Sequence, residues 1–126
     1  MKRVERYVGR YVMFDSPVTV YLIEGGDSRT VFNWRRDGYL KMEIGRAPTW
    51  PVTVGYAVHE VMETAIMLRR CHYSPYGGLM IPHVDTFLMV MQHPEFTDVT
   101  ANVGDMLALM LQELAEAWRK MGRVRT

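Results

Sequence analysis

A proline-rich segment at residues 45–51, GRAPTWP, divides the chain into two parts with different hydrophobic periods. It carries one glycine and two prolines, so we expect a loop there that ends any preceding sheet. Before this loop, runs rich in Val, Tyr and Phe are typical of strands, whereas after it apolar residues recur at helical spacing. Strands followed by helices are typical of an α+β domain, and we expect that fold class.

Four runs of strand-forming residues precede the loop, and turn signals separate them. The runs are residues 7–14, 18–24, 30–34 and 39–44. The turn signals are residues 15–17, 24–28 and 36–38. In the last run, Leu40, Met42 and Ile44 alternate with more polar residues, which indicates a strand with one covered face. The pattern predicts an N-terminal antiparallel sheet of three or four strands.

Two segments after the loop predict helices. The first, residues 52–70, is expected to be a central helix whose core stripe is Val54, Ala57, Val61, Ala65 and Leu68. At 100° per residue, the nearly opposite side carries His59, Glu63, Ile66 and Arg70. A C-terminal helix is expected to begin after an N-cap at Asp98 and to end at Gly122. Its stripe is Val103, Leu107, Met110, Leu114, Ala117 and Met121.

The composition is that of a globular protein. Of the 126 residues, 48% are hydrophobic and 23% are charged, which suits a single domain over residues 1–126 and excludes a disordered chain. The formal net charge is only +1, so no global charge attracts nucleic acid or an anionic membrane. Basic residues gather at both ends of the chain, where we interpret them as solvated charges.

The sequence also bears on location. No uncharged run reaches the roughly 20 apolar residues that cross a bilayer. Charged residues, beginning with Glu5 and Arg6, interrupt the apolar core that a signal peptide would need. The single cysteine, Cys71, excludes an internal disulfide and fits a reducing compartment. We therefore expect a cytoplasmic protein with no membrane segment, of unknown oligomeric state.

The candidate motif for metal binding or catalysis is HEVME, residues 59–63. On a helix, His59 and Glu63 lie one turn apart on the same face and could hold one ion together, whereas Glu60 points about 100° away. Burial of such groups among apolar residues costs several kcal/mol unless they are paired, and a divalent ion would pair them. Burial favours a metal only if this face of the helix is indeed buried.

HEVME resembles the HExxH helix of zincin-like metallopeptidases, in the HExxE form that also occurs among small phage and prophage proteins. The resemblance covers roughly residues 39–83 and includes a strand that precedes the helix. It implies that His59 and Glu63 are metal ligands and that Glu60 is the general base for a metal-bound water. The implied reaction is attack of this water on a peptide or other acyl bond of a peptide or small-molecule substrate.

In this class of fold, a third metal ligand comes from beyond the first helix. His83 is the favoured candidate, with Asp85, His72 and His93 as alternatives. A His, Glu, His set suits zinc, whereas one His with two carboxylates favours iron or manganese. Because Glu63 departs from the peptidase motif, metal binding is the primary expectation and hydrolysis is its extension.

Two other functions are open to this sequence. In the first, the protein is a non-enzymatic interaction factor of phage or prophage type that binds a protein partner, and HExxE is only a structural polar pair. His59 and Glu63 would then satisfy each other as i,i+4 neighbours without an ion. The second is nucleic-acid binding through the basic ends, against which stands the lack of any familiar nucleic-acid motif.

Overall fold

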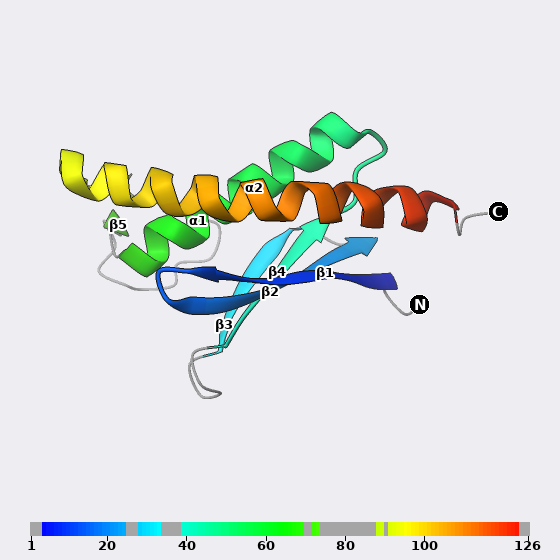
Figure 1. Cartoon of the computed structure of the whole chain (residues 1–126), viewed down its shortest axis with the longest axis horizontal. Helices are drawn as coiled ribbons and strands as arrows, with labels where there is room; N and C mark the ends of the chain where they lie inside the picture. Colours follow the sequence, from blue (N-terminus) through cyan, green and yellow to red (C-terminus); the bar gives the residue numbers. More distant parts are fainter. Residues whose placement is uncertain are drawn as a thin grey trace.

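The computed structural model describes residues 4–24, 28–33, 39–69, 72–73, 88–89 and 91–123. Their order along the chain is β1 (Val4–Met13), β2 (Ser16–Glu24), β3 (Arg29–Asn33), β4 (Tyr39–Gly45), α1 (Trp50–Arg69), β5 (His72–Tyr73), β6 (Leu88–Met89) and α2 (His93–Arg123). Strands β1 to β4 form one sheet, and both helices lie across the same face of it (Figure 1). The expected α+β layout, with an N-terminal sheet, a central helix and a C-terminal helix, is confirmed.

The sheet is mixed rather than wholly antiparallel, which corrects one detail of the sequence prediction. Its strand order is β1-β2-β4-β3, and β4 pairs in parallel with β2 and antiparallel with β3. Strand β4 occupies an inner position, where Leu40, Met42, Ile44 and even Glu43 are fully buried. Strand β3 crosses to the edge and returns the chain, so it supplies the long connection that a parallel pair requires.

The first hairpin forms as predicted, but its turn lies slightly earlier. Strands β1 and β2 pair antiparallel, and the two turn residues are Phe14 and Asp15, with φ values of 46° and 61°. Positive φ at both positions is what a tight two-residue hairpin needs. The backbone N–H of Phe14 donates to Asn102 Oδ1 of α2 at 2.9 Å, which helps to hold this turn against the helix. Ser16 and Pro17, predicted to be in the turn, already belong to β2.

The predicted stripe of α1 is confirmed at its centre. Ala57, Val61 and Ala65 are fully buried in the core between the sheet and the helices. Ile66 was predicted on the face opposite that stripe, but it is also buried, with 3% of its surface exposed. The helix therefore buries a wider arc than the predicted stripe, because it packs against both the sheet and α2.

Helix α2 starts five residues before the predicted N-cap. It begins at His93, and the backbone N–H of Gln92 donates to the Glu95 side chain at 3.1 Å, as in one half of a capping box. Asp98 lies inside the helix and is not its cap. The predicted core positions Met110, Leu114, Ala117 and Met121 are buried, and Val103 and Leu107 pack partly buried against them.

The connection between β4 and α1 is anchored on the last turns of α2. The Trp118 indole N–H donates to the carbonyl of Ala47 at 3.0 Å, and the Nε–H of Arg46 donates to the carbonyl of Trp118 at 3.2 Å. The Arg46 guanidinium also lies 4.6 Å from the centre of the Trp118 ring. These contacts set where α1 begins, and therefore how its side chains lie relative to the sheet. Within the described residues, neither helix is long and apolar enough to cross a membrane.

Candidate metal centre

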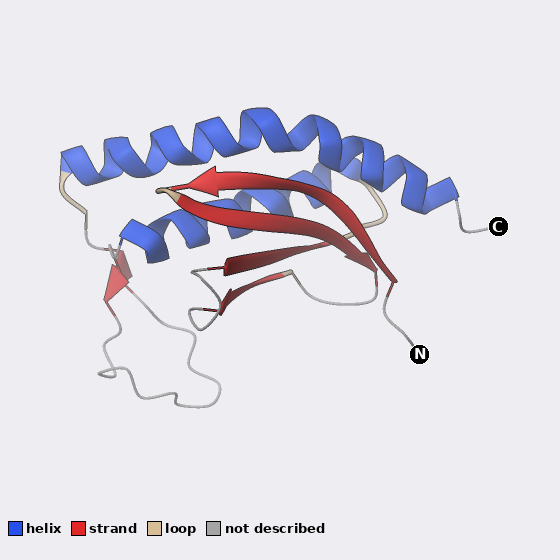
Figure 2. Cartoon of the chain, turned by 60° about the horizontal axis from the view of Figure 1, so that its bottom comes forward, coloured by secondary structure: helices blue, strands red, loops and turns tan. Residues whose placement is uncertain are grey.

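Helix α1 brings its polar motif to the side of the molecule where β3 forms the sheet edge. The helix contacts β4 and, less extensively, β3, and it runs beside α2 on its other flank (Figure 2). Its buried residues include three polar ones, Thr53, Glu60 and Thr64, which follow one another at spacings of seven and four. That spacing places all three on one side of the helix. The motif therefore has one polar residue turned inward, Glu60, and two neighbours turned outward.

The outward pair is formed by His59 and Glu63. The His59 Nε2 atom lies 2.9 Å from Glu63 Oε2, and the exposed fractions of the two side chains are 67% and 44%. The buried face that would have favoured a metal on grounds of burial is therefore absent at this pair. Because water reaches both of them, the cost of burial supplies no argument for an ion at this pair. What favours a metal here is the arrangement of donor atoms.

Glu60 is the buried member of the motif, with 6% of its surface exposed. The hydroxyl of Thr30, on β3, donates to Glu60 Oε2 at 2.9 Å, and the Thr30 and Thr64 hydroxyl oxygens lie 3.0 Å apart. Burial raises the pKa of the Glu60 carboxyl, and the negative charge of Glu63 acts in the same direction. The Thr30 hydrogen bond and the nearby His59 partly offset this rise in pKa.

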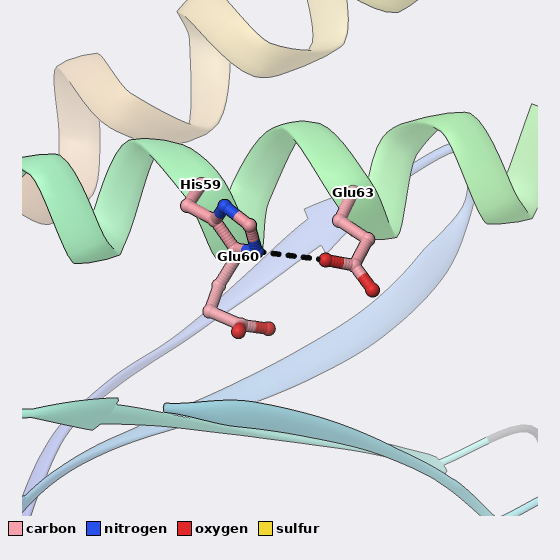
Figure 3. A group of neighbouring side chains, drawn as sticks. All are labelled: His59, Glu60 and Glu63. Carbon is pink, nitrogen blue, oxygen red and sulfur yellow. Dashed lines mark ion pairs between the residues drawn. The ribbon is translucent and has the colours of Figure 1, made fainter. Parts of the chain in front are cut away.

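The three side chains converge although Glu60 leaves the helix at a different angle. One donor atom from each of His59, Glu60 and Glu63 lies within 4.8 Å of the other two. Figure 3 shows the Glu60 carboxylate reaching toward the sheet, beneath the His59 and Glu63 pair. Ligands at about 2.1 Å from a first-row ion lie roughly 3–4 Å apart, so a spacing within 4.8 Å is near what one ion requires. On their own, an imidazole and two carboxylates favour iron or manganese, and a further imidazole such as that of His83 would shift the preference to zinc.

A groove opens beside these side chains. It has a volume of about 930 Å3, and His59, Glu60 and Tyr56 line it from α1. The facing wall includes Ser28 and Gly45, which are joined by a hydrogen bond of 2.7 Å from the Gly45 N–H to the Ser28 hydroxyl. Val52, Gly55 and residues 46–48 complete the lining. A ligand in this groove would therefore contact His59 and Glu60 directly.

The predicted third ligands do not join this group within the described residues. His83 and Asp85 lie outside the described residues, and so does the side chain of His72. His93 begins α2, close in sequence to Asp98, which pairs with Arg69 near the end of α1 at 3.7 Å. Arg69 is ten residues from His59, or about 15 Å along the helix. Among the described side chains, the third residue with an oxygen or nitrogen donor near His59 and Glu63 is Glu60, which the sequence had suggested as a base.

Sequence reasoning missed Thr30 and Thr64 as part of the site. Thr64 could have been noticed because it follows Glu60 by four residues on a helix. No local signal identifies Thr30, because it is brought to Glu60 by the pairing of β3 with β4 and the packing of α1 over them.

We expect the variant Glu60→Gln to be more stable than the wild type at neutral pH in metal-free protein. The folded protein holds the Glu60 pKa above its ordinary value of 4.5, so the wild type loses stability as pH rises from 4.5 through that raised pKa. The glutamine side chain keeps an acceptor for Thr30 but carries no charge. Urea unfolding in the presence of a chelator should show a stability difference at pH 7 that disappears below pH 4.5. A less stable variant at pH 7 would contradict this electrostatic account.

Comparison with known protein families, curated proteins and solved structures finds no match for this chain. The features that bear on function are the HEVME motif, the geometry of its three side chains and the groove beside them.

Proposed function

We propose that this protein binds a divalent first-row metal ion, with zinc as the leading candidate and iron or manganese as alternatives, through His59 and Glu63. The observation that carries the proposal is the convergence of His59, Glu60 and Glu63 donor atoms within 4.8 Å beside an open groove. His83 remains the predicted further ligand from the part of the chain outside the described residues. The activity that fits this arrangement is metal-dependent hydrolysis of a peptide or other acyl substrate held in the groove.

The contact between the His59 and Glu63 side chains is too weak to compete strongly with ion binding. His59 and Glu63 form a solvent-exposed i,i+4 pair, and such pairs contribute little to stability. Replacing this contact with an ion would therefore lower the stability of the fold only slightly.

Glu60 has the properties of a general base for such a reaction. Its carboxylate lines the groove, and burial raises its pKa toward the range in which proton transfer at neutral pH is efficient. An ion held by His59 and Glu63 would supply Lewis acidity, which would make water more acidic and polarise a substrate carbonyl group. The role of Glu60 would be to accept the proton that this water loses.

Elemental analysis of protein purified without chelator or nickel tests the proposal. We expect about one zinc, iron or manganese ion per chain in the wild type, and loss of the ion in His59→Ala and in Glu63→Ala. Glu116→Ala is a matched control, because Glu116 forms another exposed i,i+4 pair, with Lys120 at 2.9 Å on α2. That variant should keep the ion. A metal-free wild type whose thermal stability does not change with added zinc would overturn the proposal.

A second candidate function is a non-enzymatic interaction protein, and one observation favours it. All three polar side chains of the motif have protein partners without an ion: His59 pairs with Glu63, and Glu60 accepts from Thr30. On this view the exposed apolar residues of α1, Val52, Tyr56 and Met62, would contact a protein partner. The two functions differ in metal content, so the same elemental analysis separates them.

A further inference from the structure

We propose that Thr30 is a positioning residue that fixes how Glu60 faces the ion, with Thr64 as its support. The inference deepens the proposed function and rests on it. It is carried by two contacts: Thr30 Oγ1 to Glu60 Oε2 at 2.9 Å, and Thr30 Oγ1 to Thr64 Oγ1 at 3.0 Å. These contacts link the edge strand β3 to two successive turns of α1.

The direction of the hydrogen bonds follows from the donors available. A threonine hydroxyl has one hydrogen to donate and can accept at the same time. Thr30 gives its hydrogen to the Glu60 carboxylate, so in the contact between the two threonines Thr64 must be the donor. The result is a chain of two hydrogen bonds, called here the relay, in which Thr64 donates to Thr30 and Thr30 donates to Glu60. This relay orients Thr30 as a donor toward Oε2 of an ionised Glu60.

The relay leaves the two carboxylate oxygens of Glu60 unequal. Oε2 is held by Thr30, whereas no hydrogen bond within the described part of the chain restrains Oε1. An ion at His59 and Glu63, or water beside that ion, would therefore meet Glu60 mainly through one oxygen. Without the Thr30 hydroxyl, the carboxylate would lose this fixed orientation, so an ion would have to order it on binding and could meet either oxygen, which weakens binding and changes the coordination. Hydrogen-bonding partners of ligands commonly change metal affinity by 10–100-fold when removed.

The placement of Thr30 also ties the site to the sheet. Thr30 pairs with Met42 of β4 in the register of the sheet, and Met42 is fully buried. Thr64 is likewise buried, with 1% of its surface exposed. The core therefore holds the backbone of both threonines in place, as expected of hydroxyl groups that orient the Glu60 carboxylate rather than bind the ion themselves.

Cobalt titration of wild type, Thr30→Val and Thr30→Ser tests the inference. Valine has nearly the same shape as threonine and favours strands, so the fold should persist, which circular dichroism checks. We expect Thr30→Val to bind Co²⁺ roughly tenfold more weakly, with an altered visible absorption spectrum that reports a changed ligand set. Thr30→Ser keeps the hydroxyl and should restore both the affinity and the spectrum. Thr64→Val should move both in the same direction as Thr30→Val, but less.

The outcomes separate this inference from the function on which it rests. If the wild type takes up no Co²⁺ or Zn²⁺, the proposed function fails and the positioning role falls with it. If the wild type binds cobalt and Thr30→Val has the same affinity and spectrum, only the positioning role is overturned. Equal losses in Thr30→Val and Thr30→Ser would also overturn it, because the shared change would then not be loss of the hydroxyl.

Discussion

Replacing Leu114 with alanine is expected to lower the free energy of unfolding by about 2–5 kcal/mol. Leu114 is fully buried and belongs to the core cluster in which α2 packs with α1 and the sheet. The substitution removes apolar surface from that cluster and leaves a cavity, and both effects favour the unfolded state. Urea unfolding followed by circular dichroism would measure the change through the midpoint at constant slope.

Leu109→Ala is the matched control for this prediction. Leu109 is on the same helix and has the same side chain, but it is 65% exposed. Its replacement should change the free energy of unfolding by no more than about 0.5 kcal/mol. Similar losses in the two variants would mean that the packed face of α2 is not the one described, whereas a large loss for Leu114 alone confirms it.

Gly9→Ala should also destabilise the fold, by about 1–3 kcal/mol. A methyl group at position 9 would meet the phenol of Tyr11, with the ring carbon Cζ only 2.7 Å away, and would lie 3.0 Å from Glu113 Oε2. Tyr11 is 6% exposed, and its burial together with the Glu113 charge strongly raises the pKa of its hydroxyl. Its ring therefore cannot move aside without disturbing the packing of β1 against α2. Denaturant unfolding would measure this change too.

Gly104→Ala is expected to have the opposite effect. Gly104 is an exposed position inside α2, and a methyl group there would have nothing within 4 Å. Alanine should stabilise the helix by about 0.5–1 kcal/mol, because glycine loses more backbone freedom on folding. If both glycine variants changed stability in the same direction, the steric explanation for Gly9 would be wrong.

The prediction of Gly9 as a required glycine needed the structure, because two features of β1 combine there. The register of β1 and β2 shifts between Tyr7 and Gly9, which marks a bulge in the strand. Beyond that point the Tyr11 side chain folds back over the glycine, as the close approach of its phenol shows. No pattern of apolar and polar residues in β1 predicts this contact.

In the candidate site, too, features local to one helix followed from the sequence, whereas contacts between distant residues did not. The helix and the i,i+4 spacing of His59 and Glu63 followed from local sequence, and their atoms do meet, at 2.9 Å. Exposure did not follow, because helical spacing alone does not show which faces of a helix the rest of the fold covers; Met62 is 38% exposed and its neighbour Glu63 faces water. The hydrogen bond between Glu60 and Thr30 could not be predicted from hydrophobic periodicity, because the two residues are distant in sequence and meet only when the helix packs on the sheet.

The sequence by itself determined the local elements of this protein: strands before residue 45, helices after it, the first hairpin, the buried stripes and the helical spacing of the motif. These follow from residue conformational preferences and from hydrophobic periods of two and 3.6 residues, which depend only on near neighbours. Tertiary structure decided that β4 lies between β2 and β3, that His59 and Glu63 face solvent, and that Thr30 reaches Glu60. Those outcomes depend on which surfaces bury the most apolar area when distant segments pack, and that is a property of the whole chain.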